Sequence, residues 1–118
     1  MTQKTILIVD DQKDIRATLR TILEHESYTV IEAENGDDCL TKLKKIKPDL
    51  ILMDIMMPGT PVIDIVRQIS GVKIVYISAV RATDMEKKQV FHDSKITAYI
   101  EKPFNIKEVI TCVKKIIQ

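Results

Sequence analysis

The chain alternates between two kinds of segment, which differ in the spacing of their apolar residues. Five short runs have the length of β-strands, and three of them are almost continuous Ile, Leu, Val or Met. Unbroken runs of this kind are typical of strands that are covered on both faces. We predict strands over residues 5–9, 29–33, 50–53, 73–77 and 98–100. The second and fifth runs are more mixed, which favours positions at the edges of a sheet.

The segments between these runs carry apolar residues at the spacing of one helix face. We predict that Asn35 caps the second helix and Asn105 the last one, and that a third helix covers residues 62–69. Thr83 begins a Thr-Asp-Met-Glu capping-box pattern, which predicts the start of a fourth helix with a thin apolar face. The strand–helix alternation occurs five times, which predicts a parallel sheet with right-handed crossovers and helices on both faces.

Composition narrows the function classes. A length of 118 residues suits one domain with a hydrophobic core, so we predict a single domain over residues 1–118. The formal net charge of +1 gives no general attraction to nucleic acid or to an anionic membrane. No apolar run approaches the roughly 20 residues of a membrane span. We therefore expect no direct contact with nucleic acid and no insertion into a membrane.

The cysteines and histidines are interpreted as structural. Cys39 and Cys112 belong to no CxxC motif, and reduced thiols of this kind fit a cytoplasmic location. They fall in helices on opposite faces of the predicted sheet, so we expect no disulfide between them. His25 and His92 are expected at helix ends on the surface. A basic cluster is interpreted as a solvated helix terminus, with a phosphate or nucleic-acid patch as the alternative; it comprises Lys42, Lys44, Lys45 and Lys47.

Polar residues follow four of the predicted strands at the point where each strand ends. Asp10 and Asp11 follow the first strand, and Asp54 follows the third. Ser78 follows the fourth strand, and Lys102 stands just after the fifth. In an open parallel sheet, functional groups gather at the carboxyl ends of the strands. If these strands are neighbours, three carboxylates, a hydroxyl and an ammonium group meet at one edge.

Three carboxylates in one place require a cation, because a buried charge is costly unless it is paired. Oxygen ligands without a nearby His or Cys favour Mg²⁺, with Mn²⁺ as a possible substitute. The Lys102 ammonium and the Ser78 hydroxyl complement the oxygens of a phosphoryl group. The pattern therefore predicts phosphoryl transfer onto Asp54, which would act as the nucleophile and form an aspartyl-phosphate.

The chain resembles response-regulator receiver domains, the phosphoacceptor modules of two-component signalling, over nearly its whole length. The resemblance rests on "ILIVDDQ", "ENGDDCL", "PDLILMDIMMPG", "VYISA" and "AYIEKPF" in this order. It implies a flavodoxin-like α/β fold, a doubly wound (βα)5 sheet with strand order 2-1-3-4-5. It also implies a sensor histidine kinase as the phosphoryl donor. The downstream target or output domain is not identified, and both a monomer and a phosphorylation-dependent dimer fit the pattern.

The resemblance also assigns roles around the metal. Asp54 matches the phosphoacceptor, and its carboxylate is one of the expected metal ligands. Asp11 resembles the direct ligand of Mg²⁺, and Asp10 resembles the acid that binds the ion largely through water. The main-chain carbonyl of Met56 matches the family's backbone ligand. The implied protein is a regulator that catalyses only its own phosphorylation and dephosphorylation, and not an enzyme acting on another substrate.

Further residues match the family's switch. Ser78 resembles the hydroxyl that moves toward the phosphoryl group, and Lys102 resembles the lysine that pairs with it. The bond between Lys102 and Pro103 matches the family's usual cis peptide. Tyr99 matches the aromatic residue that turns inward when Ser78 shifts, with a passive half-exposed position as the alternative. The implied output is a change in the face formed by the fourth helix, the fifth strand and the fifth helix.

The chain departs from the family pattern in its loops. Val62 stands where a glycine is common, and Lys95–Ile96 replaces the usual Gly-Ala pair. We expect loop shape and partner choice to differ there, without an effect on the acid site. Met56 and Val80 are apolar at positions that resemble those controlling water access, which predicts loss of the phosphoryl group over minutes or longer.

Three other interpretations remain open on the sequence. A phosphatase of the haloacid-dehalogenase type would carry an Asp-x-Asp pair after the first strand, whereas Asp10 and Asp11 are adjacent here. A flavodoxin-like cofactor binder would need a glycine- and hydroxyl-rich loop in place of "DDQKD". A pseudo-receiver would bind partners without being phosphorylated. The chain is compatible with a stand-alone regulator and with one part of a longer protein.

Overall fold

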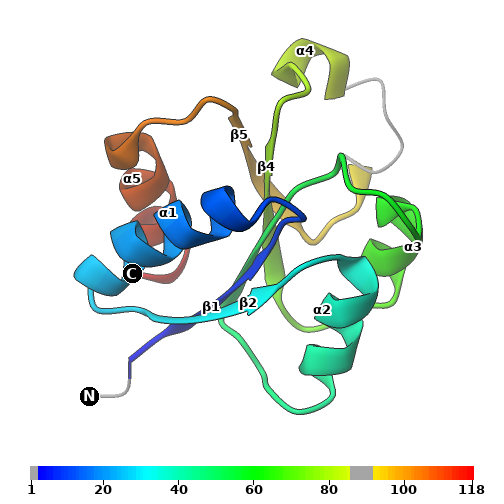
Figure 1. Ribbon diagram of the computed structural model, residues 1–118, viewed down its shortest axis with the longest axis horizontal. Helices are drawn as coiled ribbons and strands as arrows, with labels where there is room; N and C mark the ends of the chain where they lie inside the picture. The colour runs from blue at the N-terminus through cyan, green and yellow to red at the C-terminus, as the bar shows by residue number, and fades with distance from the viewer. Residues whose placement is uncertain (1–2, 86–91) are drawn as a thin grey trace.

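Five parallel strands form one sheet in the order β2-β1-β3-β4-β5. The computed structural model describes residues 3–85 and 92–118 (Figure 1). The strands are β1 (Thr5–Val9), β2 (Thr29–Ala33), β3 (Leu50–Met53), β4 (Lys73–Ser78) and β5 (Ile96–Glu101). The helices are α1 (Lys13–His25), α2 (Gly36–Leu43), α3 (Val62–Arg67), α4 (Ala82–Met85) and α5 (Ile106–Ile117).

The sheet confirms the predicted α/β fold and its strand order. The first three strands have the predicted bounds, and the two mixed strands, β2 and β5, lie at the edges. The fourth strand extends by one residue to Ser78, and the fifth runs from Ile96 to Glu101. Both strands end later because Ser78 pairs with Glu101, and β5 begins earlier because Ile96 pairs with Ile74. Backbone pairing thus continues beyond the apolar runs.

Two hydrophobic layers cover the sheet, with α1 and α5 on one face and α2 and α3 on the other (Figure 1). Successive strand residues alternate between the layers, so that Ile6 packs in the first and Leu7 in the second. Cys112 packs against the first layer and Cys39 lies within the second. The two cysteines therefore lie on opposite faces of the sheet, as predicted, and both thiols are free.

Asparagine side chains begin two helices as predicted. Oδ1 of Asn35 accepts a hydrogen bond from the backbone N–H of Asp38 at 2.7 Å, at the start of α2. Oδ1 of Asn105 accepts one from the N–H of Glu108 at 2.7 Å, at the start of α5. Each bond satisfies an N–H group that the helix itself leaves unpaired.

Two helix boundaries differ from the prediction. The fourth helix begins at Ala82, so Thr83 lies inside it and is not its capping residue. The N–H of Asp84 already bonds to the carbonyl of Arg81 at 2.9 Å, which starts the helix before the Thr83 hydroxyl could cap it. The predicted continuation, with Val90 and Phe91, lies outside the described residues. The third helix ends at Arg67 because the next two amides, of Gln68 and Ile69, bond three residues back.

The loops that depart from the family pattern have regular local structure. Val62 is the first residue of α3 and its side chain is buried, while Pro61 precedes it at the helix start. The positive φ of this loop falls on Gly59, at 98°, where a glycine is tolerated without strain. The turn into β5 is held by Asp93, whose carboxylate accepts the N–H of Lys95 at 2.9 Å.

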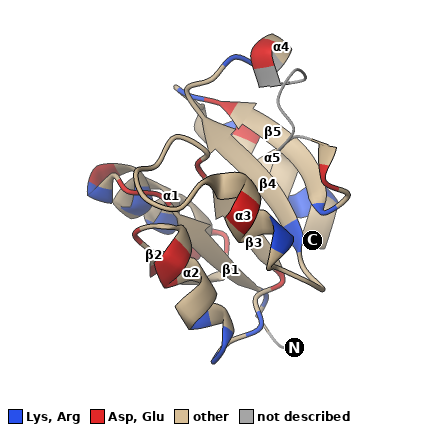
Figure 2. Cartoon of the chain, turned by 90° about the vertical axis from the view of Figure 1, so that its right-hand side faces the viewer, with Lys and Arg blue, Asp and Glu red and all other residues tan. Residues whose placement is uncertain are grey.

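Charge along α2 follows the helix dipole (Figure 2). Asp37 and Asp38 occupy its first turn and Lys42 its last. Lys44, Lys45 and Lys47, which follow the helix, are exposed. This distribution agrees with a solvated helix terminus. Among the described residues, no helix combines the length and the apolar character needed to cross a membrane.

Candidate functional site

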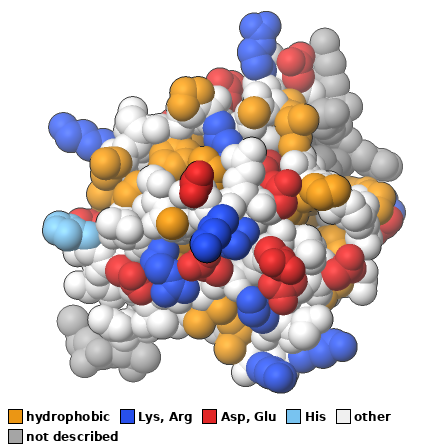
Figure 3. All heavy atoms as spheres, viewed as in Figure 1, with side chains coloured by type: hydrophobic (Ala, Val, Ile, Leu, Met, Phe, Trp, Pro, Cys, Tyr) orange, Lys and Arg blue, Asp and Glu red, His pale blue; other side chains and the backbone are white. Residues whose placement is uncertain are grey.

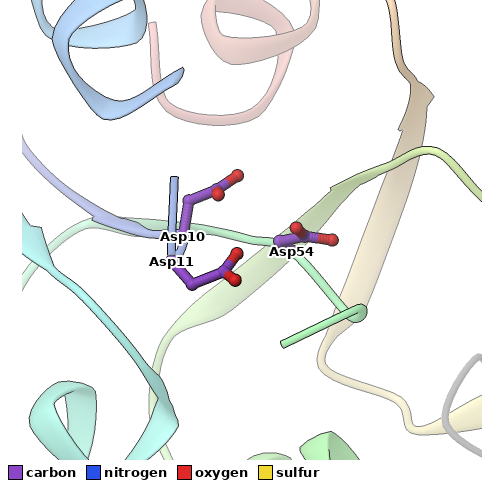
Figure 4. Close-up of side chains that lie close together, drawn as sticks. All are labelled: Asp10, Asp11 and Asp54. Atoms are coloured by element: carbon purple, nitrogen blue, oxygen red, sulfur yellow. The ribbon is translucent and has the colours of Figure 1, made fainter. Parts of the chain in front are cut away.

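Three carboxylates meet at the carboxyl edge of the sheet, as Figure 4 shows for Asp10, Asp11 and Asp54. Each offers an oxygen atom, and these atoms all lie within 4.8 Å of one another. Asp10 and Asp54 are buried, with 2% and 5% of their surface exposed, whereas Asp11 is open to solvent. The cluster is therefore a partly buried acid site with one side accessible to a ligand.

Strand register brings the acids together. Val9 and Met53, the last residues of β1 and β3, are paired in the sheet. The N–H of Asp54 donates to the carbonyl of Val9 at 2.9 Å, which continues the ladder for one more step. The aspartates that follow these two strands consequently emerge side by side.

Lys102 reaches into the same site from the end of β5. Its Nζ lies 2.8 Å from Oδ2 of Asp10 and 3.2 Å from Oδ2 of Asp54. The N–H of Lys102 donates to the carbonyl of Ser78 at 2.8 Å, so pairing with β4 sets its position. Burial lowers the pKa of Lys102, but the hydrogen bond to Asp10 and the charges of both aspartates outweigh burial and raise it. The side chain is therefore a cation over the whole ordinary pH range.

The site carries an excess of negative charge. Burial, and to a smaller extent the charge of Asp54, raises the pKa of Asp10 above its ordinary value, although bonds from Lys102 and from the N–H of Gln12 oppose this rise. Among the described residues, three carboxylates face one ammonium group, and the ligand atoms that the acids offer are all hard oxygens. This donor set fits a divalent cation such as Mg²⁺, which would supply the missing positive charge.

Both oxygens of Asp54 have defined partners. Oδ1 accepts the N–H of Met56 at 3.0 Å, and Oδ2 faces Lys102. The Met56 side chain is 60% exposed, so the residue occupies the rim of the site. The described contact of the Met56 main chain at this site is made by its N–H group. Coordination of a metal by its carbonyl stays a prediction.

Ser78 and Tyr99 are linked through the loop that follows β4. Ser78 is fully buried, and its Oγ accepts the N–H of Val80 at 3.4 Å, a long hydrogen bond. The hydroxyl of Tyr99 donates to the main-chain carbonyl of Val80. It also lies 3.5 Å from the main-chain carbonyl oxygen of Ser78. Burial is the main cause that raises the pKa of Tyr99. Tyr99 is thus half-buried and directed toward this loop.

The described geometry places each residue that the sequence singled out. It joins Lys102 directly to two of the acids and links Ser78 to Lys102 through the backbone. The peptide bond between Lys102 and Pro103 is cis, as the resemblance implied. His25 and His92 are exposed, and the acid cluster consists of aspartates.

One residue at the site had no sequence signal. Nη1 of Arg16, in α1, donates to the main-chain carbonyl of Asp10 at 2.7 Å. In the sequence, Arg16 is one of two arginines, with Arg20, that lie four positions apart on one face of the first helix. This spacing is ordinary for an exposed helix, and the contact depends on how α1 docks against the sheet.

Comparisons with known proteins agree on one family. A model of the response regulator receiver domain matches residues 6–114. The chain is 42% identical to the transcriptional regulatory protein ResD of Bacillus subtilis over 114 residues, which is 96% of this chain and 48% of that protein. It is 36% identical to the alkaline phosphatase synthesis transcriptional regulatory protein PhoP of the same organism over 98% of this chain and 49% of that protein. The chain therefore spans about half the length of the curated relatives it matches.

Solved structures match the whole architecture. The chemotaxis response regulator CheY4 of Vibrio cholerae superposes with a TM-score of 0.87 at 27% identity, covering 98% of this chain and 100% of that one. The response regulator TrrA of Thermotoga maritima, in complex with Mg²⁺ and BeF, superposes with a TM-score of 0.85 at 30% identity and also covers 98% of this chain and 100% of that one. A complex of the histidine kinase ThkA with TrrA gives 0.83 at 29% identity, again with 98% and 100% covered.

Proposed function

Because this chain belongs to the response regulator receiver domain family, we propose that it is a phosphoacceptor switch in which Asp54 receives a phosphoryl group from a histidine kinase. One observation carries the proposal: the Asp54 carboxylate lies beside two further carboxylates and 3.2 Å from the Lys102 ammonium. The solved complexes of TrrA, with Mg²⁺ and BeF and with the kinase ThkA, support the same assignment by similarity.

The proposed transfer is a substitution at phosphorus. An oxygen of Asp54 attacks the phosphorus of a phospho-histidine, the phosphorus–nitrogen bond breaks, and the electron pair leaves with the imidazole, which takes up a proton. The product is an acyl phosphate on Asp54. Asp10, Asp11, Asp54 and the Met56 carbonyl would hold Mg²⁺, or Mn²⁺ in its place, which supplies positive charge to the phosphoryl oxygens when bound.

Lys102 is the chain's own cation for this step. It already lies within hydrogen-bonding distance of Asp54, so it needs only a small displacement to bind a phosphoryl oxygen there. Its bond to Asp10 holds the ammonium group in place before the phosphoryl group arrives. Such preorganised charge stabilises a transition state more effectively than a mobile side chain does.

The switch would run from Ser78 to Tyr99. Within the described part of the chain, the bond that the Ser78 hydroxyl makes is the long one to Val80, so a phosphoryl oxygen can recruit it at small cost. Movement of the loop that contains Val80 alters the carbonyl to which Tyr99 donates. The face formed by α4, β5 and α5 then shifts between two populations. The output is a change in affinity for a protein partner, or in dimerisation, and not catalysis on another substrate.

The setting of this switch belongs to the same proposal. We place one receiver domain over residues 1–118, in the cytoplasm, with protein partners and no direct contact of this segment with nucleic acid. Some curated relatives, such as MtrA of Mycobacterium tuberculosis, are described as DNA-binding response regulators, and about half of their length is matched. The downstream target of this chain is a protein or an output domain yet to be identified.

Acetyl phosphate tests the proposal. The wild-type chain, incubated with acetyl phosphate and Mg²⁺, is expected to gain the mass of one phosphoryl group. The label should be absent from Asp54→Asn, which keeps the shape of the side chain, and from wild type in excess EDTA. An unlabelled wild-type chain would favour the pseudo-receiver interpretation. Repeated turnover of p-nitrophenyl phosphate would favour the phosphatase interpretation, which family membership argues against.

A further inference from the structure

Arg16 connects the acid site to the edge strand of the sheet. Its Nη1 donates to the main-chain carbonyl of Asp10 at 2.7 Å, and its Nε donates to Oε1 of Glu32 at 3.0 Å. The side chain is only 14% exposed, so the guanidinium group is enclosed between α1 and β2. A single side chain thereby joins the loop that carries Asp10 to β2, the edge strand next to β1.

The Glu32 carboxylate is itself firmly held. Its Oε2 accepts Nε of Arg20 at 2.6 Å, and its main-chain carbonyl accepts Nζ of Lys42. Pairing with Ile8 of β1 fixes its backbone in the sheet. Acidic and basic side chains lie next to one another across the middle of the face in Figure 3. Glu32 therefore offers Arg16 a stationary anchor.

With Arg16 in place, each polar atom of Asp10 has a partner. Its N–H donates to the carbonyl of Ala33 at 3.2 Å, and its carbonyl accepts Arg16. Its Oδ1 accepts the N–H of Gln12 at 2.9 Å, and its Oδ2 accepts Lys102. The two main-chain bonds fix the position of the Asp10 backbone, and the two side-chain bonds fix the direction of its carboxylate. Loss of the Arg16 bond would leave the Asp10 carbonyl free to rotate, and the carboxylate with it.

We propose that Arg16 is a positioning residue for the divalent-cation site, acting through the main chain of Asp10 and anchored by Glu32. This inference rests on the proposed function, because it assumes that the acids hold Mg²⁺. Arginine suits the role because its rigid fork presents two donors in fixed directions at the same time. Lysine would keep the positive charge, but its single ammonium group cannot reproduce this fork. Position and charge can therefore be separated by experiment.

Arg20 provides a matched control. It lies one turn further along α1 and bonds to the same Glu32 carboxylate, at 2.6 Å, and also to Glu24 at 3.2 Å. Its described contacts do not include Asp10. Removing either arginine deletes an ion pair with Glu32, but only removal of Arg16 deletes the bond to the acid site. A general effect of the ion-pair network would thus appear in both variants.

The test is direct titration of Mg²⁺ by isothermal titration calorimetry, with melting temperatures measured in EDTA alongside. Outer-shell partners of a metal site are typically worth about 10- to 100-fold in affinity, so Arg16→Gln and Arg16→Lys should each weaken Mg²⁺ binding by at least about tenfold. Arg20→Gln should stay within about twofold of wild type, because its target does not touch a ligand. The melting temperatures of Arg16→Gln and Arg20→Gln should fall by similar amounts.

Unchanged Mg²⁺ affinity in Arg16→Gln would overturn the inference, as would an equal loss in Arg20→Gln. Wild-type affinity in Arg16→Lys would overturn the positional role and leave charge as the cause. These results leave the proposed function intact as long as wild type binds Mg²⁺. A wild-type chain that binds no Mg²⁺ would overturn both the metal-dependent function and this inference.

Discussion

Nζ of Lys102 lies 3.2 Å from Oδ2 of Asp54, although 48 positions separate the two residues. The register of three neighbouring strands brings them together. Without a metal, this ammonium group is the described cation that pairs directly with the carboxylates of Asp10 and Asp54. It would therefore compete with Mg²⁺ for the same oxygens and assist it once a phosphoryl group is present.

Lys102→Gln should separate these two effects. Loss of the positive charge increases the negative potential of the site, so Mg²⁺ should bind several-fold more tightly in a calorimetric titration. Labelling by acetyl phosphate should slow by about 100-fold, because a donor aimed at the phosphoryl oxygens has been removed. Lys107→Gln, at an exposed position in α5, is the control and should resemble wild type. Weaker Mg²⁺ binding by Lys102→Gln would contradict the competition.

Asp10→Asn should stabilise the metal-free protein. The raised pKa of Asp10 means that the folded chain binds a proton there more tightly than the unfolded chain does. The ionised carboxylate therefore reduces stability at neutral pH, and this cost disappears as the pH falls below the ordinary value of 3.8. We expect the melting temperature in EDTA to rise by a few degrees at pH 7, with the gain shrinking toward pH 4.

The same substitution should weaken Mg²⁺ binding, so stability and metal affinity should change in opposite directions. Asp14→Asn serves as the control, because Asp14 is an exposed acid in the first turn of α1. Its loss removes a favourable interaction with the helix dipole and should lower the melting temperature slightly. A lower melting temperature for Asp10→Asn would show that its bond to Lys102 outweighs its burial.

Gly36→Ala should destabilise the fold. A Cβ atom at Gly36 would lie 2.5 Å from Cγ1 of Ile65, so α2 and α3 would have to separate. We expect a loss of about 1–3 kcal/mol in the free energy of unfolding, measured in urea, which is the usual range for overpacking. The sign is opposite to that of a Gly-to-Ala change at an open helix position. The double variant with Ile65→Ala should lose less than the sum of the two single losses.

The phosphoryl group on Asp54 should persist for minutes or longer. Met56 is at the rim of the site and Val80 is half-buried in the adjoining loop, and neither side chain can orient an attacking water molecule. Met56→Asn should shorten the lifetime several-fold, measured as loss of label in Mg²⁺ buffer after removal of acetyl phosphate. Thr83→Asn, on an exposed side chain of α4, should not. Loss of the wild-type label within seconds would contradict this expectation.

The two thiols should differ sharply in reactivity. Cys39 is fully buried, and burial raises its pKa to about 12, so it is almost never the reactive thiolate. Cys112 is half-buried and burial raises its pKa too, but part of its surface is accessible. A thiol reagent such as Ellman's should label Cys112 first and Cys39 only on unfolding. Cys112→Ser should abolish the first phase, and equal rates in wild type would contradict the assignment.

The strands and the meeting of the acids could be predicted because both follow from local pattern and one general rule. Apolar runs predicted where the strands lie, although the mixed run of β5 gave too short a strand. The rule that functional groups gather at strand ends placed Asp10 and Asp54 together. The strand order came from resemblance to a family, since an apolar run does not identify its neighbour. The predicted start of α4 is wrong because the Thr83 pattern indicates a cap, whereas the helix already begins at Ala82. The bond from the N–H of Asp84 to the carbonyl of Arg81 forms its first turn without that cap.

The role suggested for Arg16 lay beyond sequence reasoning for a different reason. Its partners, Asp10 and Glu32, lie on separate elements, and the contact exists only after α1 has packed across β1 and β2. Nothing in the spacing of charges distinguishes Arg16 from Arg20, which faces the same glutamate. Tertiary docking, and not local pattern, selects which arginine reaches the acid site.

The pairing of Val9 with Met53 has a consequence for how this chain tolerates insertions. One additional residue within β1 or β3 would advance its aspartate by roughly 3.3 Å and exchange the strand's two sets of side chains between the faces. Extra residues in the crossover between β2 and β3, away from the capped start of α2, would leave both aspartates where they are. The spacing of the two acids along the chain can therefore drift, while the lengths of the two strands that precede them cannot.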